Sequence, residues 1–378
     1  MRIEQSRWDP DSGWQEPAGH GLDQAGLVLV FGSPSALNGA EPLTALVRRY
    51  PEALLVGCST AGEICGTRVT DRSLVATAVA FEATPMVAGR VRIREASQSF
   101  EAGRQLAAAI PTAGLCHAFV LSDGLGVNGS ELVRGLRTGL PPNVSLTGGL
   151  SGDGADFHRT YVIWQGRPES GIATIVGFYG DRLTVGYGSL GGWDPFGPER
   201  LITRSAGNVL YEMDGQSALA LYKAYLGEHA AGLPATGLLF PLSLRIAEGE
   251  TGVVRTILAV DEEAQSMTFA GDVPEGSYAR LMKANFDRLI DGAVGAAKTS
   301  RLTECGRPPD LAVLISCIGR KLILGQRVEE EVEGVRDVLG NDVPLTGFYS
   351  YGEISPFTPL AKCELHNQTM TITTFTER

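Results

Sequence analysis

Three stretches of the sequence share one pattern: ALLVGCSTAGEI at residues 53–64, VSLTGGLSGDG at 144–154 and VPLTGFYSYGEI at 343–354. Each begins with apolar residues typical of a buried strand and ends in a glycine-rich turn that carries a carboxylate. The middle copy is one residue shorter and has aspartate in place of glutamate. A pattern that recurs at three places in one chain predicts a repeated structural unit.

An apolar strand and a helical segment precede each copy of the pattern. The expected first strands cover 27–31, 118–121 and 311–315, and the expected helices cover 41–49, 130–140 and 328–339. Two apolar strands joined by a helix form a parallel pair with a right-handed crossover. The sequence therefore predicts an α/β fold with mixed, α+β-like sheets, in which repeated strand–helix–strand units place the turns where open sheets bind ligands.

We expect two adjoining domains, at residues 21–205 and 206–378, after a flexible tail at residues 1–20. The boundary is placed near the loop GGWDPFGPE, where the repeated pattern is interrupted. Two further helices are expected between the second and third units, at 217–226 and 277–297, where apolar residues recur at helical spacing.

Composition excludes several classes of protein. The formal net charge is −11, with 32 Lys and Arg against 43 Asp and Glu, and no basic stripe is present, which argues against nucleic-acid binding. No apolar run approaches the roughly 20 residues of a membrane span, and the amino terminus lacks the apolar core of a secretory signal. The six cysteines are scattered without a CxxC pair, so we expect a cytoplasmic protein without a structural zinc site. A homo-oligomeric state stays open.

Longer motifs resemble those of the FIST proteins, a family of intracellular signal-transduction proteins with adjoining FIST-N and FIST-C domains. The most specific are GCSTAGEI (57–64), GFYSYGEI (347–354) and LHNQT (365–369). The stretch VLYEMDGQSALALYKAYLG (209–227) is similar to the opening of the FIST-C domain, and FAGDVPEGSYARLM (269–282) to its middle. The resemblance covers nearly the whole chain, about residues 21–378.

The resemblance implies a sensor and not an enzyme. FIST proteins are thought to bind small ligands such as amino acids and to signal to kinases, cyclic-di-GMP enzymes or chemotaxis proteins. A bacterial subset resembles haem-containing nitric oxide sensors, similar to NosP, that regulate a partner histidine kinase in two-component signalling. The chain carries no kinase segment of its own, so the resemblance implies signalling in trans to a histidine kinase or a cyclic-di-GMP enzyme.

The glycine–acid turns are the first candidate site. Backbone N–H groups and a carboxylate at a strand end would hold a ligand amine or amide. Alternatively, the glycines serve the turn geometry and the acid caps a neighbouring turn. The candidate ligand-binding residues are Cys58, Ser59, Thr60, Glu63, Ser151, Asp153, Tyr349, Ser350, Tyr351, Glu353 and Asn367.

His366 is the candidate axial ligand for haem b, because a neutral imidazole binds haem iron. The alternative is a core histidine held by a hydrogen bond. A competing hypothesis of another class is a hydrolase that uses Cys58 or Ser59, although the sequence has no GxSxG motif. Arg320 and Lys321 lie in the loop after the strand expected at 311–315, and we expect both to be solvent-facing charges.

The prediction is therefore a cytoplasmic small-molecule sensor. Its most concrete form is a haem-based nitric oxide sensor, and the alternative within the same class binds an amino-acid-like metabolite without haem.

Overall fold

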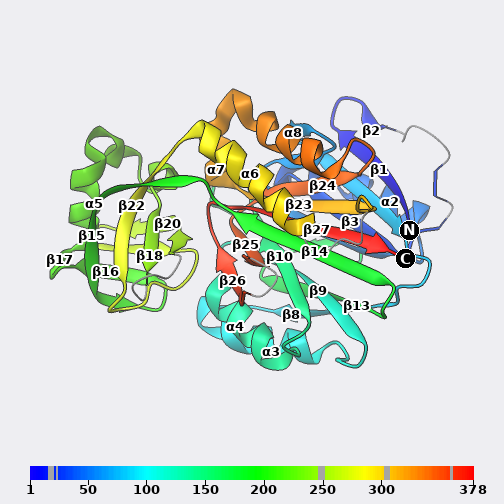
Figure 1. Cartoon of the computed structure of the whole chain (residues 1–378), viewed down its shortest axis with the longest axis horizontal. Helices are drawn as coiled ribbons and strands as arrows, with labels where there is room; N and C mark the ends of the chain where they lie inside the picture. The colour runs from blue at the N-terminus through cyan, green and yellow to red at the C-terminus, as the bar shows by residue number, and fades with distance from the viewer. Residues whose placement is uncertain (16–20, 23, 246–251, 302–306, 358–360) are drawn as a thin grey trace.

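The computed structural model describes residues 1–15, 21–22, 24–245, 252–301, 307–357 and 361–378 of the chain. Its secondary structure is mixed α/β, as the repeated pattern predicts. Figure 1 shows two parts, a larger part that holds both termini and a smaller part at the left. We call residues 1–192 and 285–378 the body, and residues 193–284 the lobe.

The body contains three copies of one unit: a parallel strand pair with a helix between its strands, then a hairpin and a closing strand. Unit 1 consists of β3 (Leu27–Gly32), α2 (Ala40–Arg49), β4 (Leu54–Ser59), β5 (Glu63–Cys65), β6 (Arg68–Thr70) and β7 (Leu74–Ala80). Unit 2 consists of β9 (Leu115–Ser122), α4 (Gly129–Gly139), β10 (Ser145–Leu150), β11 (Val162–Trp164), β12 (Arg167–Glu169) and β13 (Ile172–Tyr179). Unit 3 consists of β23 (Leu311–Cys317), α8 (Val328–Leu339), β24 (Leu345–Ser350), β25 (Gly352–Pro356), β26 (Cys363–His366) and β27 (Met370–Glu377). The repeated strand–helix–strand units are confirmed.

One glycine in each second strand is required by close packing. The pairs β3–β4, β9–β10 and β23–β24 are parallel, as expected. A Cβ atom built on Gly57, Gly148 or Gly347 would lie 1.7–1.8 Å from a carbonyl oxygen of the first strand. No side chain fits at that distance, so the shared glycine of the motif allows the two backbones to approach.

Each unit contributes its hairpin to the sheet of another unit. The hairpin β5–β6 pairs with β24, β11–β12 pairs with β4, and β25–β26 pairs with β10. Unit 1 thus completes the sheet of unit 3, unit 2 completes that of unit 1, and unit 3 completes that of unit 2. This exchange forms a closed ring, and it brings the three glycine–acid turns to one place.

An additional antiparallel strand lies beside each closing strand. These strands are β1 (Arg2–Asp9) next to β7, β8 (Met86–Arg92) next to β13 and β14 (Leu183–Leu190) next to β27. Part of the segment expected as a tail therefore forms β1 and the short β2 (Gly13–Gln15), whereas residues 16–20 lie outside the described residues. The charges in RIEQSRWD interrupt the apolar pattern by which a strand is recognised in sequence. The amino group of Met1 is 3.4 Å from a carboxylate oxygen of Glu377, so the two ends of the chain lie side by side (Figure 1).

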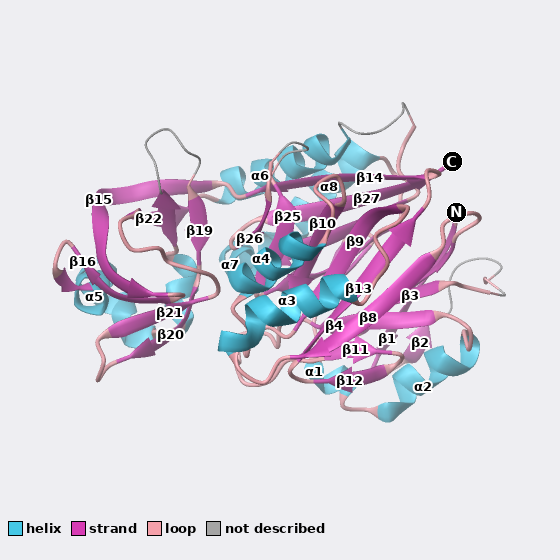
Figure 2. Cartoon of the chain, turned by 90° about the horizontal axis from the view of Figure 1, so that it is seen from below, coloured by secondary structure: helices cyan, strands magenta, loops and turns pink. Residues whose placement is uncertain are grey.

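Helices cover the sheets in pairs (Figure 2). α3 (Ser99–Ala108) packs on α4, and a Cβ on Gly103 or Gly135 would lie 2.2 or 2.0 Å from a carbonyl oxygen of the facing helix. α6 (Phe286–Ser300) packs on α8. The helix expected at 277–297 is thus shorter at its start, because residues 278–284 form a strand of the lobe and Asn285 caps α6. Two short helices, α1 (Pro34–Leu37) and α7 (Ile318–Leu324), follow the first strands of units 1 and 3.

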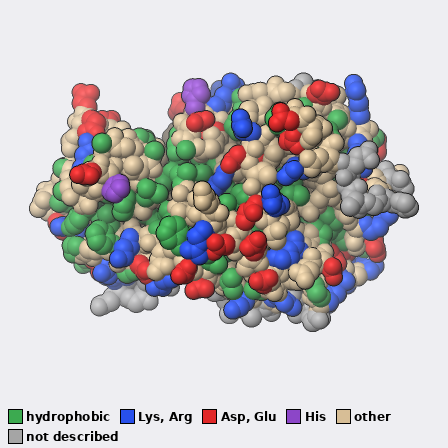
Figure 3. All heavy atoms as spheres, turned by 90° about the horizontal axis from the view of Figure 1, so that it is seen from above, with side chains coloured by type: hydrophobic (Ala, Val, Ile, Leu, Met, Phe, Trp, Pro, Cys, Tyr) green, Lys and Arg blue, Asp and Glu red, His purple; other side chains and the backbone are tan. Residues whose placement is uncertain are grey.

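In its described residues, the lobe is a strongly curved antiparallel sheet with the α-helix α5 and two short 3-10 helices. Its strands are β15 (Trp193–Ala206), β16 (Val209–Met213), β17 (Gln216–Ser217), β18 (Leu242–Arg245), β19 (Val253–Arg255), β20 (Ile257–Asp261), β21 (Ser266–Phe269) and β22 (Tyr278–Ala284). α5 (Ala218–Leu226) is the helix expected at 217–226, and Ser217 caps it. The domain boundary expected at 205/206 lies at the end of β15, inside the lobe. Hydrophobic side chains gather on the lobe surface and where the lobe meets the body (Figure 3).

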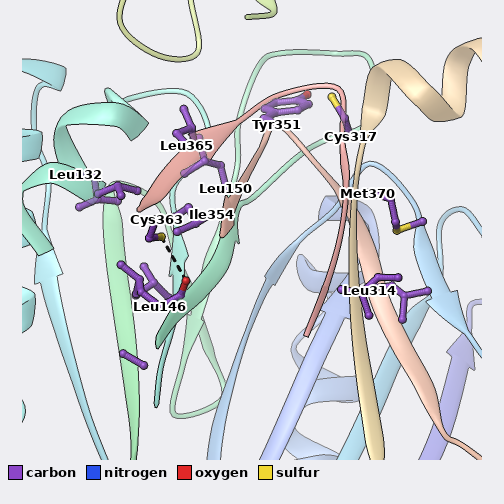
Figure 4. Packing of buried hydrophobic residues seen from close by; sticks show 14 of the residues in the cluster. Leu132, Leu146, Leu150, Leu314, Cys317, Tyr351, Ile354, Cys363, Leu365 and Met370 are labelled. Atoms are coloured by element: carbon purple, nitrogen blue, oxygen red, sulfur yellow. Dashed lines mark hydrogen bonds between the residues drawn. The ribbon is translucent and has the colours of Figure 1, made fainter. Parts of the chain in front are cut away.

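The core beneath α4 fixes the position of β26. Leu132 of α4 packs with Leu146 and Leu150 of β10 and with Leu365 of β26 (Figure 4). The thiol of Cys363 donates a hydrogen bond to the carbonyl of Leu146 at 3.3 Å. This packing holds the 363–366 strand beside α4, where both face the lobe. Within the described ranges, no helix is long and apolar enough to cross a membrane.

Candidate functional site

The three glycine–acid turns meet at the carboxyl ends of β4, β10 and β24. The amide of Gly152 in the second turn donates to the carbonyl of Ser59 in the first at 2.9 Å. The amide of Ala61 donates to the carbonyl of Tyr349 at 2.8 Å, and the amide of Asp153 donates to the hydroxyl of Tyr351 at 3.3 Å. Each turn is thus hydrogen-bonded to the other two. We call residues 58–63, 151–153 and 349–353 the central turn cluster.

The central turn cluster is closed to solvent. It contains ten of the predicted site residues, and the other two, Asn367 and His366, lie next to it. None of the twelve is more than 6% exposed: Cys58, Ser59, Thr60, Glu63, Ser151, Asp153, Tyr349, Ser350, Tyr351, Glu353, His366 and Asn367. A ligand would reach them only after the turns separate, so their role in ligand binding stays a prediction.

Glu63 and Glu353 occupy equivalent places in units 1 and 3. Each accepts a hydrogen bond at 2.5 Å from the hydroxyl three residues before it. Each also accepts from the amide and the hydroxyl of the residue before the closing strand, Ser73 or Thr369. Burial raises the pKa of Glu63 to about 7 and that of Glu353 to about 8. These contacts connect each hairpin to its closing strand. They agree with the alternative in which the acids of the motif stabilise neighbouring turns.

Asp153 has different partners from the two glutamates. It accepts hydrogen bonds from the amides of residues 157, 158 and 159 and from the hydroxyl of Tyr351. Burial, together with the carboxylate of Asp153, raises the pKa of Tyr351. In unit 2 it is Asp123 that accepts from the amide of Gly171 at the start of the closing strand, at 3.0 Å. In unit 2 the contact with the start of the closing strand is therefore made by Asp123 and not by Asp153, the acid of the motif.

The surroundings of His366 do not fit a haem. Its Nε2 donates to the carbonyl of Ser355 at 2.6 Å, and its ring centroid lies 3.9 Å from that of Phe357. Its Nδ1 has no hydrogen-bond partner among the described residues, and the side chain is 1% exposed. Burial lowers the pKa of His366 to about 4, so the ring is neutral at pH 7. An axial ligand needs a free nitrogen that faces a space for the macrocycle, and the described arrangement provides none at this ring.

Cys58 and Ser59 are not arranged as nucleophiles. Burial raises the pKa of the Cys58 thiol, which disfavours the reactive thiolate. The hydroxyl oxygen of Ser59 accepts a hydrogen bond from the amide of Tyr161 at 2.8 Å. In the described part of the chain, no histidine is hydrogen-bonded to either side chain, and an activated nucleophile needs such a base. That the protein is not an enzyme stays a prediction.

The expectation that Arg320 faces solvent is wrong. Arg320 is fully buried and forms an ion pair at 2.7 Å with Glu331, which is also fully buried. Its guanidinium donates to the carbonyls of Gly191 and Leu289, both at 2.7 Å. Glu331 in turn accepts from the hydroxyl of Tyr349 at 2.6 Å. Gly191 and Leu289 lie at the two chain segments that join body and lobe, so Arg320 connects this junction to the central turn cluster.

Lys321 is also largely enclosed. Its ammonium donates to the carbonyl of Ala61 at 2.8 Å and pairs with the carboxylate of Asp71. It lies 5.6 Å from the centre of the Tyr349 ring. The charges of both residues therefore serve contacts within the protein, which the polar loop pattern could not indicate.

A cleft of about 590 Å³ lies between the body and the lobe. One wall comes from α4 and from residues 362–365, and the other comes from β18, β19 and residues 272–274. Pockets for small molecules commonly have volumes of roughly 300–1,000 Å³. The charged residues that line the cleft are Glu131, Arg134, Arg137, Arg255, Asp272, Lys362 and Glu364.

Four polar residues connect the two walls of this cleft by hydrogen bonds: Asn128, Ser130, Arg255 and Asp272. Arg255 donates to the carbonyl of Asp272 at 3.0 Å, to that of Leu365 at 2.9 Å and to the hydroxyl of Ser130 at 3.3 Å. The Ser130 hydroxyl also accepts from the amide of Asp272 at 3.1 Å, and the side-chain amide of Asn128 donates to the Asp272 carboxylate at 2.7 Å. Asn128 is also the cap of α4, because its side-chain oxygen accepts from the amide of Glu131.

The LHNQT motif forms a second contact between body and lobe. The side chain of Asn367 accepts from the amide of Thr256 at 3.4 Å and donates to the carbonyl of Tyr351 at 3.1 Å. The side-chain amide of Gln368 donates to the carbonyl of Leu238 at 3.0 Å, and the backbone carbonyl of Gln368 accepts from the indole of Trp193 at 2.9 Å. Asn367 therefore lies between the central turn cluster and the lobe.

Sequence reasoning missed the cleft and its residues. Arg255 is a lone charge within the apolar stretch GVVRTILAV, and a charge inside a strand-like run is the signal that could have singled it out. Asp272 lies inside the family-like motif at 269–282, but no local pattern relates it to Asn128. Their contact joins segments 144 residues apart and exists only in the folded chain.

Two comparisons with individual proteins gave distant matches. An uncharacterized protein of Methanocaldococcus jannaschii is 24% identical over 209 residues, which cover 51% of this chain and 39% of that protein. The chain thus spans about two fifths of the length of this curated relative. The crystal structure of cyanuric acid hydrolase from A. caulinodans aligns over 93% of this chain and 90% of that one, with 8% identity and a TM-score of 0.37. That likeness is too slight to carry an argument.

Family models match nearly the whole body and lobe. The FIST N domain matches residues 26–216, and the FIST C domain matches residues 218–356. These two matches agree with the motifs at 57–64, 209–227 and 347–354 and with the repeated mixed α/β architecture. The chain therefore belongs to the FIST family, whose domains provide sensory input to signal transduction.

Proposed function

We propose that this chain is a small-molecule sensor that binds its ligand in the cleft between body and lobe. The observation that carries the proposal is the construction of the cleft: its two walls belong to two parts of the chain, and a charged side chain that is only 7% exposed, Arg255, lines it. Another hollow of about 580 Å³, near Cys116 and Asp181, has no buried charged side chain in its lining.

The lobe is joined to the body by two neighbouring chain segments, as expected of a domain that moves about a hinge. The chain enters it at Trp193 and leaves it at Ala284, and these two residues pair across β15 and β22. Hydrogen bonds hold it to α4 and to the LHNQT motif, and interfaces between parts of one chain commonly permit relative motion. A ligand that contacts both walls favours one position of the lobe, which is a shift of population. The Arg320 contacts give that movement a route to the central turn cluster.

The output of the sensor acts in trans. A partner histidine kinase or cyclic-di-GMP enzyme, as the family resemblance implies, would recognise one position of the lobe. The geometry favours the metabolite version of the sensor over the haem version, because an open cleft already exists at Arg255, whereas His366 is closed. Haem binding at His366 would require a space to open around its ring, which is buried against Phe357. A Soret band in the purified protein that is lost in His366→Ala would support haem sensing.

A library screen tests the cleft directly. We expect at least one compound from a set of amino acids, organic acids, amines, sugars and nucleosides to raise the melting temperature of the full chain, because a ligand that binds only the folded state stabilises it. The variant Val253→Trp fills the cleft from a half-buried position without a change of charge, and it should abolish the effect. The matched control, Val47→Trp on the exposed face of α2, should retain it.

Hydrogen exchange then tests the movement of the lobe. With the ligand bound, residues 190–193 and 365–369 should exchange at changed rates, because they lie at the junction of the two parts. The proposal fails if no compound stabilises the protein, or if Val253→Trp binds every hit as tightly as the wild type does.

A further inference from the structure

Arg255 is a buried cation without a carboxylate partner. Among the residues that the structure describes, no acidic side chain lies within ion-pair distance of its guanidinium, and its hydrogen-bond acceptors are the carbonyls of Val254, Leu365 and Asp272 and the hydroxyl of Ser130. All four acceptors are neutral. In the body, by contrast, the buried Arg320 is paired with Glu331 at 2.7 Å.

An unpaired buried charge is costly to the free protein. Taking a guanidinium out of water costs several kcal/mol, and neutral acceptors return only part of that cost. Burial lowers the pKa of Arg255 to about 10, and the more distant carboxylates of Glu364 and Asp272 oppose this effect only in part. Arg255 is therefore charged at neutral pH and would gain from an anion in the cleft that it lines.

Hydrogen-bond donors remain at this place. A guanidinium has five N–H donors, and only one contact, to Ser130 at 3.3 Å, is made by its second terminal nitrogen. The oxygen of Ser130 accepts two hydrogen bonds, from Arg255 and from the amide of Asp272, which leaves the hydroxyl proton to donate. Both side chains line the same cleft. Ser130 also lies in the first turn of α4, where the helix dipole favours an anion.

Two other arginines of the cleft are already engaged, and Lys362 is exposed to solvent. Arg134 forms an ion pair with Glu131 in the same helix. Arg137 donates to the carbonyls of Val144 and Pro142, at the body end of α4. Arg255 is thus distinguished from Arg134 by the lack of a charged partner, and from Arg137 and Lys362 by its greater burial.

We propose that Arg255 and Ser130 form an anion subsite in the cleft, and that the ligand is a small molecule whose carboxylate binds there. This rests on the proposed function, because it names the chemistry of the ligand of the same cleft. The carboxylate accepts from the second terminal nitrogen of Arg255 and from the Ser130 hydroxyl, and the remainder of the ligand contacts the opposite wall. The anion thus takes the place of the weak contact between Arg255 and Ser130 and draws on residues of both lobe and body.

Three probes of matched length test this assignment by calorimetry on the full chain: glutarate, its neutral diamide glutaramide, and the cation 1,5-diaminopentane. We expect glutarate to bind and the other two not to bind. Arg255→Met should weaken glutarate binding by about 10- to 100-fold, since a hydrogen bond to a charged group contributes that much. Arg255→Lys keeps the charge and should retain part of the affinity. The control Arg134→Met removes a paired cation of the same cleft and should change affinity by less than about threefold.

The arms separate the two hypotheses. Thermal unfolding of Arg255→Met and Arg255→Lys establishes that both variants are folded. The anion subsite is wrong if the compounds whose binding is lost in Val253→Trp are neutral or cationic. It is also wrong if Arg255→Met binds glutarate as the wild type does. In either case the proposal of a sensor cleft stands. If inorganic phosphate binds through Arg255 and glutarate does not, the carboxylate assignment is wrong. If no anion binds at all, the subsite is wrong, and the library screen alone then decides the proposed function.

Discussion

Buried titratable side chains surround the places where the three units meet. Burial raises the pKa of Glu63 to about 7 and that of Glu353 to about 8, and it lowers the pKa of His117 to about 3 and that of His366 to about 4. The glutamates favour the folded state at low pH, because the folded protein keeps a proton that the unfolded chain releases above about 4.5. The histidines act in the opposite direction below about 6.5.

At the residue scale, the first prediction concerns Glu353. The free energy of unfolding of the wild type should fall relative to that of Glu353→Gln by about 1.4 kcal/mol per pH unit between pH 5 and 7.5, because only the wild type has a proton to retain there. Denaturant unfolding at several pH values measures the difference. The same measurement on Glu101→Gln, at an exposed position of α3, serves as the control. A flat difference for Glu353→Gln would mean that the carboxyl is ionised in the folded protein.

The second prediction concerns Gly347. Replacement by alanine should destabilise the protein by about 3 kcal/mol or prevent folding, because the new Cβ would lie 1.8 Å from the carbonyl oxygen of Leu314. Gly126→Ala is the control, since its Cβ would have its nearest neighbour at 3.7 Å. Chemical denaturation of both variants measures the effect. Equal stability of the two variants would contradict the close approach of the parallel strands.

At the scale of elements, α4 has two tasks. Its amino terminus is capped by Asn128, and the same side chain donates to Asp272 of the lobe. The helix also packs on α3 and on β26, so it lies between the core of unit 2 and the cleft. Capping and lobe contact involve different atoms of Asn128, because the oxygen accepts from the amide of Glu131 and the nitrogen donates to Asp272.

The third prediction separates these two tasks. Asn128→Ala removes both and should lower stability by about 1 kcal/mol, the usual cost of a lost cap. Asn128→Asp retains a capping oxygen but places a second carboxylate against Asp272, so the cap is kept while repulsion between the two carboxylates removes the lobe contact. Hydrogen exchange at residues 270–273 should increase in both variants. Unchanged exchange in Asn128→Asp would show that this contact does not hold the lobe.

At the scale of the whole molecule, the exchange of hairpins makes the three units interdependent. β5 pairs with β24, β10 with β25 and β14 with β27, and in each pair the two strands lie far apart in the sequence. The lobe is different, because its own sheet is complete within residues 193–284. The body is therefore one cooperative structure formed by both family domains, and the lobe is an insertion into it.

The fourth prediction follows from this dependence. A fragment of residues 1–216, which contains the matched FIST N domain, should not unfold cooperatively, because three of its sheets lack partner strands. A chain in which a short glycine linker joins Gly192 to Asn285 should fold, because the removed segment begins and ends at the paired residues Trp193 and Ala284. Circular dichroism during thermal unfolding compares the two. A cooperative transition of the fragment, or an unfolded lobe-deleted chain, would contradict the arrangement.

The repeated motif by itself determined the unit of this protein. The apolar strands, the helices between them and the parallel pairing follow from the local pattern. The glycine at position 57, 148 or 347 is the residue that allows two neighbouring strands to approach closely. The family also followed from ordered motifs along the chain. These features depend on residues near one another in sequence, where periodicity and turn chemistry act directly.

Only the tertiary structure decided which strands complete which sheet and where a ligand has room. The hairpin exchange joins residues as far apart as Glu63 and Phe348, and nothing in the motif indicates which sheet a hairpin enters. The same packing buries the predicted turn residues and encloses Arg320, while it opens a cleft at Arg255 between distant segments. Burial and pairing of a charge depend on what the rest of the chain places around it, so the residues alone could not distinguish a buried ion pair at Arg320 from an unpaired cation at Arg255.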